Sequence, residues 1–181
     1  SAAVSLDARI AAGKIKLAGK SRLDRLEFVE PASLEANLTT LLPYWEGADG
    51  LLLNGTLSKQ DDGYQYSGDA TLRIAEGSSL PFETVSGPVT ATLEDGRIPF
   101  SANVIVTKPV AGNPTFAGIL GEQVHLSGTG VYELASRRLL VDAIELTHKS
   151  GTAQLLGEAN FRSNDLNLTG KISQDIAALP G

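Results

Sequence analysis

Strict alternation of apolar and polar side chains is the feature that most constrains the fold of this chain. In residues 64–74, YQYSGDATLRI, apolar or small residues take every even position and polar residues take every odd one. A period of two places the two kinds of side chain on opposite faces of a half-buried β-strand. Similar alternation recurs in the segments 4–10, 13–20, 22–29, 50–58, 63–74, 83–94, 97–107, 123–134, 138–148, 151–162 and 165–172. The chain is therefore predicted to be mainly β.

Short polar joints connect most of these segments. The dipeptides Asp62-Gly63 and Asp95-Gly96 favour two-residue hairpin turns, because both residue types tolerate a positive φ. Tight joints make neighbouring strands antiparallel, since a crossover to a parallel strand needs a dozen or more residues. The sequence thus predicts one long antiparallel meander.

One segment departs from the period of two. In residues 31–47, PASLEANLTTLLPYWEG, four leucines have helical spacing, Ser33 can cap a helix and Pro43 ends the run. We therefore predict one short helix near residues 33–42, lying against an end of the sheet.

The end of the chain repeats this signal. Residues 173–181, SQDIAALPG, look like the start of a second helical element. We therefore predict a single β-rich segment of a larger repetitive protein. In this division residues 1–30 end one unit, residues 31–172 form a helix plus a meander, and residues 173–181 begin the next unit.

Glycines that fall in the apolar register predict where the sheet bends. They are Gly55, Gly68, Gly87, Gly128, Gly130, Gly157 and Gly170. Glycine inside a strand marks a bend, a bulge or a close approach. Eleven strands of about ten residues also exceed what a flat sheet sustains. We predict an elongated trough, a curled sheet that is open on one side; from the residues alone, a sandwich or barrel with a filled core remains the alternative.

The predicted inner face of the trough is aliphatic, which suits flexible acyl chains better than flat ligands. Each acyl methylene removed from water contributes about 0.8 kcal/mol. The residues predicted to line this lipid groove are Leu53, Leu57, Leu72, Ile74, Val89, Leu93, Val104, Leu126, Ile144, Leu155, Phe161, Leu168 and Ile172.

Composition and motifs disfavour several function classes. A formal net charge of −6 argues against a nucleic-acid partner, because a phosphate-binding surface needs clustered Lys and Arg. The chain has no cysteine, and its two histidines, His125 and His148, come without an organised acidic cluster, so no metal site is predicted. It also lacks a nucleophile elbow, a phosphate-binding loop and a dinucleotide fingerprint. We expect no cofactor and no catalytic residues.

The long glycine-punctuated strands carry a family resemblance. They include VHLSGTGVYELASRRLLVDAIELTHKSGTAQLLGEANF and LNLTGKIS, and they follow the leader SLEANLTTLLPYWEGADGLLLNGTLS. In these stretches the chain resembles the large AsmA-like proteins of Gram-negative bacteria. The leader resembles the repeated unit of the TamB branch, the inner-membrane subunit of the translocation and assembly module, and DIAALPG looks like the next copy. The resemblance covers residues 33–181.

This resemblance implies a function and a location. Proteins of the family are anchored in the inner membrane and cross the periplasm, with β-structure folded into a taco-like trough that has a hydrophobic interior. They are implicated in moving phospholipids to the outer membrane. The TamB branch also partners an Omp85-type outer-membrane barrel and is linked to protein secretion and outer-membrane protein assembly; the parts that would contact the barrel are not in this sequence.

Two further expectations concern partners and alternatives. An exposed edge strand invites pairing with another chain, so an edge-to-edge dimer is expected for this segment. The alternative function, compatible with a filled core, is a structural or adhesive β-sandwich domain of a secreted or surface protein.

Overall fold

The computed structural model describes residues 2–10, 13–22, 27–28, 31–39, 48–61, 63–76, 78, 82–108, 121–163 and 165–174. Every regular element in these ranges is a β-strand, which confirms the predicted fold class. Within the same ranges, we find no helical segment capable of crossing a bilayer.

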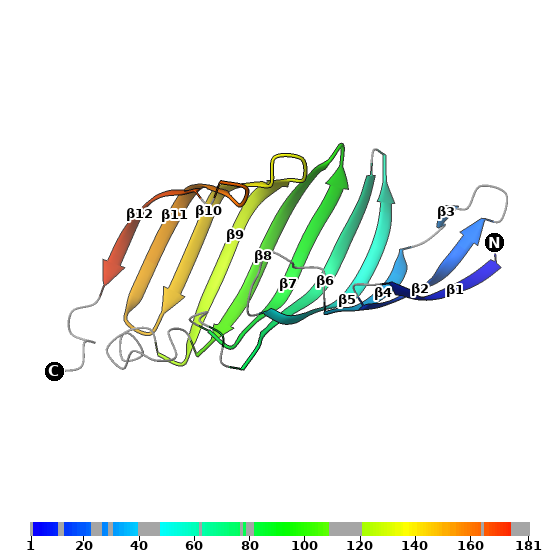
Figure 1. The fold of residues 1–181 in the computed structure, drawn as a ribbon, viewed down its shortest axis with the longest axis horizontal. Helices are drawn as coiled ribbons and strands as arrows, with labels where there is room; N and C mark the ends of the chain where they lie inside the picture. The colour runs from blue at the N-terminus through cyan, green and yellow to red at the C-terminus, as the bar shows by residue number, and fades with distance from the viewer. Residues whose placement is uncertain are drawn as a thin grey trace.

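The described residues form twelve strands (Figure 1). They are β1 (Ala2–Ile10), β2 (Gly13–Arg22), β3 (Glu27–Phe28), β4 (Ala32–Leu38), β5 (Ala48–Gln60), β6 (Gly63–Ile74), β7 (Thr84–Glu94), β8 (Arg97–Thr107), β9 (Gln123–Glu133), β10 (Arg138–His148), β11 (Gly151–Asn160) and β12 (Asp165–Gln174).

All described strands belong to one antiparallel sheet. Its order is β1-β2-β4-β5-β6-β7-β8-β9-β10-β11-β12, and the short β3 pairs with β2 beside this path. The predicted meander is therefore confirmed, and β1 and β2 join the same sheet as the rest. Of the strand predicted at 22–29, the structure describes Arg22, the last residue of β2, and Glu27–Phe28, which form β3. Residues 23–26 and 29–30 lie outside the described residues.

The joint between β7 and β8 is the tight turn that the sequence predicts. Asp95 has φ 46° and Gly96 has φ 74°, so both central residues adopt the left-handed conformation that primed hairpin turns require. Asp62, in the other predicted hairpin dipeptide, lies outside the described residues.

The helix predicted near residues 33–42 is wrong, because residues 32–38 form strand β4 between β2 and β5. Leu34 and Leu38 are four residues apart, a spacing shared by a helix and by one face of a strand. Ser33 caps nothing; its hydroxyl donates to the Ala18 carbonyl oxygen of β2 at 3.2 Å. Residues 40–42 lie outside the described residues, as do residues 175–181 of the second predicted element, while Ser173 belongs to β12.

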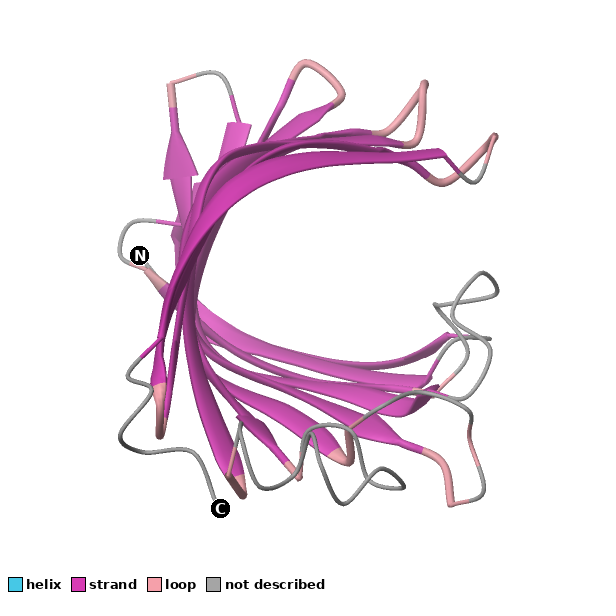
Figure 2. Ribbon diagram, turned by 90° about the vertical axis from the view of Figure 1, so that its left-hand side faces the viewer, coloured by secondary structure: helices cyan, strands magenta, loops and turns pink. Residues whose placement is uncertain are grey.

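The sheet is strongly curved and does not close. Viewed along the row of strands, its cross-section is C-shaped, and each long strand bends near its middle (Figure 2). The edge strands β1 and β12 stand at opposite ends of the strand order, so no barrel and no sandwich of two packed sheets forms from the described strands. The solvent-accessible surface is 11683 Å², against about 8,400 Å² expected for a globular monomer of this mass. The predicted trough is thus the observed architecture.

Candidate functional site

The concave face carries three apolar rows that run across the sheet, and we call them the floor of the trough. The middle row follows the bend and consists of Leu6, Leu17, Leu34, Gly55, Gly68, Val89, Ala102, Gly128, Ile144, Leu155 and Gly170, each opposite the next on the neighbouring strand. Each of the eleven strands in the sheet path contributes one member. Antiparallel partners share a face, so the row is continuous.

The second and third rows flank the middle one, two residues away along each strand, or three where the bulge in β10 separates Val141 from Ile144. On one side the row includes Ala8, Ile15, Ala36, Leu53, Ala70, Val104, Leu126, Leu146, Ala153 and Ile172. On the other side it includes Ala32, Leu57, Tyr66, Ala91, Phe100, Gly130, Val141, Gly157 and Leu168. None of these side chains is charged, and Tyr66 alone carries a polar group.

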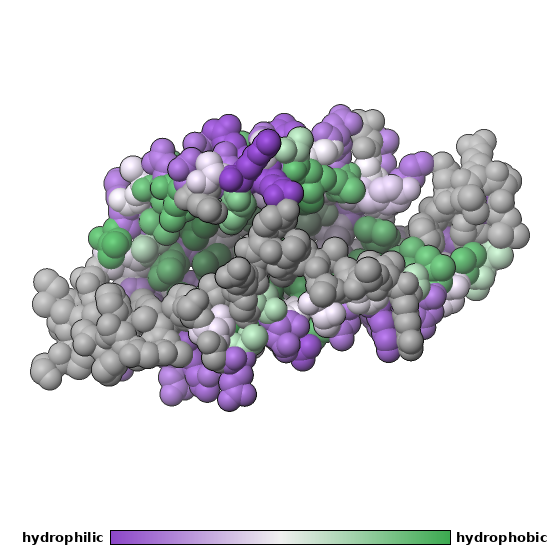
Figure 3. Space-filling view, in the orientation of Figure 1, coloured by the Kyte–Doolittle hydropathy of each residue, from purple (hydrophilic) through white to green (hydrophobic). Residues whose placement is uncertain are grey.

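Solvent exposure distinguishes the two faces. The buried apolar residues lie on the concave register, among them Ala36, Leu72, Val104 and Val124, with 3–9% of their surface exposed. Most other floor residues are only half-buried, because no second layer of described residues covers them. Hydrophobic residues gather in the hollow of the trough, between polar margins (Figure 3).

Close backbone contacts at the glycines form the bend. A Cβ atom on Gly55 would lie 2.4 Å from the Ser67 carbonyl oxygen, and one on Gly68 would lie 2.4 Å from the Gly55 Cα. Such distances leave no room for a side chain on either residue. The sequence prediction that these glycines mark the bend is consistent with this geometry.

Aromatic rings fill part of the space that the glycines leave. Phe100 stands directly opposite Gly130, and its ring would touch a Cβ placed there at 3.0 Å. Tyr132 and Phe161 form a tilted ring pair with centroids 6.3 Å apart. Rings over glycines restore apolar contact where the sheet has no side chain of its own.

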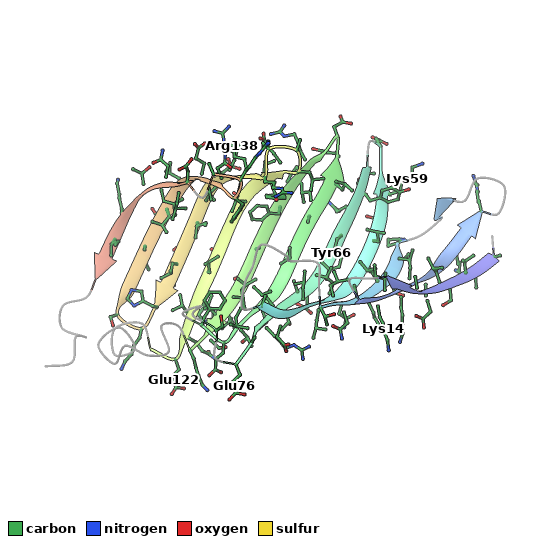
Figure 4. The ribbon with its side chains drawn as sticks, viewed as in Figure 1. Lys14, Lys59, Tyr66, Glu76, Glu122 and Arg138 are labelled. Atoms are coloured by element: carbon green, nitrogen blue, oxygen red, sulfur yellow. The ribbon has the colours of Figure 1, made fainter. Side chains whose placement is uncertain are left out.

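The polar group of Tyr66 is satisfied within the protein. Its hydroxyl donates to the Asp69 carbonyl oxygen at 2.7 Å, and the side chain is 9% exposed, in the interior of the sheet in Figure 4. Burial raises the pKa of the Tyr66 phenol, a backbone hydrogen bond from Asn54 lowers it, and the Asp69 carboxylate raises it further, with a net increase. This hydroxyl group therefore has its hydrogen-bond partner within the bend of the sheet, and we assign it no role in ligand binding.

A pH dependence follows from Tyr66. Above about pH 10 the phenol ionises first in the unfolded chain, so the free energy of unfolding falls as the pH rises toward the raised folded-state pKa. Tyr66→Phe is expected to cost about 1 kcal/mol at neutral pH through the lost hydrogen bond, and to remove this alkaline loss. Urea denaturation of the wild type and of Tyr66→Phe, from neutral pH to above about pH 10, should show that the difference between their free energies of unfolding shrinks as the pH rises.

The matched control is Tyr64→Phe, at a tyrosine of the same strand that is 49% exposed. It should leave the free energy of unfolding at neutral pH within about 0.5 kcal/mol of the wild type. A difference between wild type and Tyr66→Phe that stays constant with pH would contradict the assignment.

Charged side chains lie on the convex face and at the ends of the strands. Lys16 and Glu35 face each other across β2 and β4 at 3.6 Å, and Arg138 pairs with Glu158 across β10 and β11. A hydrogen bond to Glu158 raises the pKa of the Arg138 guanidinium. Lys14, Lys59, Glu76, Glu122 and Arg138 are seen around the margins of the trough in Figure 4. Exposed pairs of this kind contribute little stability.

The two histidines do not meet. His125 is opposite Thr147, so the adjacent His148 lies on the other face of the sheet. The backbone N–H of Ser150 donates to His148 Nδ1 at 3.3 Å. The described residues include no group of three His, Cys, Asp or Glu placed to hold a metal ion.

The residues predicted to line the groove share one face. Twelve of them are strand residues on the concave register, and Phe161 follows β11 in the turn, against Tyr132. The sequence prediction missed Ala32, Ala36 and Leu38, because β4 was expected to be a helix. It also left out Tyr66 and Val124, although their alternation with polar neighbours places both on the same face. Phe100 and Val141, which the structure places on the concave register, were left out as well.

Comparison of the chain with protein-family models, with curated proteins and with solved structures finds no match.

Proposed function

We propose that the trough shields the acyl chains of phospholipids from water and that the protein acts without catalysis. In this proposal the floor binds lipid tails through contact area alone. The polar convex face and the charged margins remain in water.

The observation that carries the proposal is a continuous apolar floor that the described part of the chain leaves uncovered. Eleven strands supply one residue each to the middle row, and no charge interrupts any of the three rows. An apolar surface of this length is unfavourable in water unless something apolar occupies it. Five buried methylenes would already contribute about 4 kcal/mol. The aliphatic character of the floor favours flexible chains over stacked rings.

The resemblance to the TamB branch extends the proposal to a location. We propose that the chain is a segment of a periplasm-spanning envelope protein, anchored in the inner membrane, that helps phospholipids pass between the two membranes. Assistance in outer-membrane protein assembly, through a barrel of the Omp85 type, belongs to the same proposal and would involve other parts of the parent protein.

Lipid binding can be tested directly on the protein purified without detergent. Native mass spectrometry should show phospholipid bound to the chain, and an acyl probe that fluoresces in apolar surroundings should bind saturably and be displaced by phospholipid. A folded protein that carries no lipid and binds no probe would rule out the shielding role.

A further inference from the structure

The two margins of the trough differ in the exposure of their apolar side chains. At the margin where β5, β7 and β9 end, Tyr64 is 49%, Leu93 is 46% and Leu134 is 45% exposed. At the opposite margin, Leu72 of β6 and Val124 of β9 are only 9% and 3% exposed. We call Tyr64, Leu93 and Leu134 the lip. It extends the apolar floor to the edge of β6, β7 and β9, which are interior strands of the sheet.

A row of four charged residues of alternating sign borders the lip. Glu94, which directly follows Leu93, stands opposite Arg97, and Arg97 stands opposite Glu133. Glu133 in turn stands opposite Arg138. The four residues come from the neighbouring strands β7, β8, β9 and β10. Neighbouring strands are about 4.8 Å apart, so opposite charges alternate along the margin at about this spacing.

Arg97 is the member of this row that is available to a ligand. It is exposed and forms no ion pair with a described residue, whereas Arg138 is paired with Glu158. The neighbouring carboxylate of Glu133 is held at the margin, because the Ser136 hydroxyl donates to its Oε2 at 2.8 Å. The row therefore presents a guanidinium between two carboxylates.

The charges around Arg97 select the kind of anion that it can bind. A lone phosphate on its guanidinium would lie between Glu94 and Glu133, and both carboxylates would repel it. A phosphate that carries an ammonium group on a short linker offsets this repulsion, because the ammonium can donate to a carboxylate on the next strand. The row is thus complementary to a zwitterion and not to a simple anion.

We propose that this margin binds the headgroup of a zwitterionic phospholipid, with its phosphate on Arg97 and its ammonium on the carboxylates of Glu94 and Glu133. The glycerol backbone lies over the lip, and the acyl chains run inward along the strands onto the floor. Tyr64 and Tyr132 suit this boundary, because a tyrosine combines an apolar ring with a polar hydroxyl. This assignment, which rests on the proposed shielding of acyl chains, adds the class of lipid and the margin that holds its headgroup.

Displacement of an uncharged fluorescent acyl probe by soluble phospholipids tests the preference. Dihexanoyl phosphatidylethanolamine, which is zwitterionic, and dihexanoyl phosphatidylglycerol, which is anionic, are each added to the full chain below their critical micelle concentrations. The zwitterionic lipid should displace the probe at about threefold lower concentration, the effect expected of an exposed charge pair. Glycerophosphoethanolamine has the same headgroup without chains and should not displace the probe at these concentrations. Displacement by this compound would overturn the proposed binding mode.

Substitutions at the margin separate the two roles. The double variant Glu94→Gln, Glu133→Gln should weaken binding of the zwitterionic lipid and strengthen binding of the anionic one, because it removes both the partner of the ammonium and the repulsion of an anion. Arg97→Gln should weaken binding of both lipids about threefold. The matched control is Glu76→Gln, Glu122→Gln, which changes the net charge equally. Both of these exposed carboxylates lie on the opposite margin (Figure 4), so both affinities should stay within about twofold.

The acyl probe also separates this inference from the proposed function. Its own affinity should stay within about twofold in all of these variants, because the probe carries no charged headgroup. A wild type that binds no probe would overturn the shielding role and the headgroup assignment together. If the probe binds but both phospholipids displace it equally, the headgroup assignment fails and the shielding role stands. The same conclusion follows if the double glutamate variant changes both affinities in one direction.

Discussion

Replacing Gly55 with alanine is expected to destabilise the protein by more than about 3 kcal/mol. The new methyl group would lie 2.4 Å from the Ser67 carbonyl oxygen and 2.6 Å from the Gly68 Cα. Both are backbone atoms of β6, so the clash cannot be relieved by a side-chain rotation. Relief requires separating β5 from β6 at the bend, where the residues on each side are paired.

The control for this prediction lies in the same strand. A Cβ on Gly50 would have its nearest neighbour, the Leu38 carbonyl oxygen, at 3.4 Å, an ordinary contact distance. Gly50→Ala is therefore expected to change the free energy of unfolding by less than about 1 kcal/mol. Chemical denaturation of the two variants and the wild type measures the difference. Equal effects at the two sites would show that the bend does not depend on the missing Cβ of Gly55.

Much of the architecture could be predicted because the alternation is long and regular. A run such as residues 63–74 fits a strand and nothing else, and the dipeptide Asp95-Gly96 defines the turn between β7 and β8. Alternation did not predict strand β4, and the reason is physical. It is short, Leu34 and Leu38 satisfy both periods, and the leucines that follow extend the helical pattern.

The floor could be predicted in part from the parity of the apolar residues. In β10 this parity changes, since Leu139 and Val141 are apolar before the shift and Ile144 and Leu146 after it. The structure has a bulge there, with register shifts against both neighbours. A bulge inserts one residue and so changes which positions face the concave side. The change of parity in β10 is therefore visible in the sequence itself.

Whether the sheet stays open could not be predicted from the sequence. Glycines on the apolar register indicate a bend, but the total curvature depends on contacts between neighbouring backbones, such as Gly55 against Gly68 and Phe100 against Gly130. Those contacts depend on register, which a single strand does not specify. The openness matters for function, because a closed sheet would use the same aliphatic residues as its own core, whereas an open one presents them to a ligand.

If the floor binds acyl chains, a charge added to the concave face should lower the affinity for an acyl probe, and a charge added to the convex face should not. Leu126→Glu places a carboxylate on the concave register, next to Val104 and Leu146, where an acyl chain is proposed to lie. Desolvating that charge costs about 2 kcal/mol or more, so the affinity for an acyl probe should fall roughly thirtyfold. Ser127→Glu adds the same charge one residue later, on the exposed convex face. It should leave the affinity within about twofold, since an exposed charge has only a weak, screened effect.

A second pair of variants protects this test against loss of folding. Leu93 is on the concave register but 46% exposed, so the folded sheet should tolerate Leu93→Glu. The variant should still lower the affinity for the acyl probe. Thr92→Glu, one residue earlier on the convex register, is its control. Probe titrations on all four variants, each with a denaturation curve, separate binding from stability. The decisive quantity is the ratio of affinities within each pair, because the net charge is the same for both members. Ratios near one in folded variants would mean that the probe binds outside the trough, and the concave floor would then lose its proposed role.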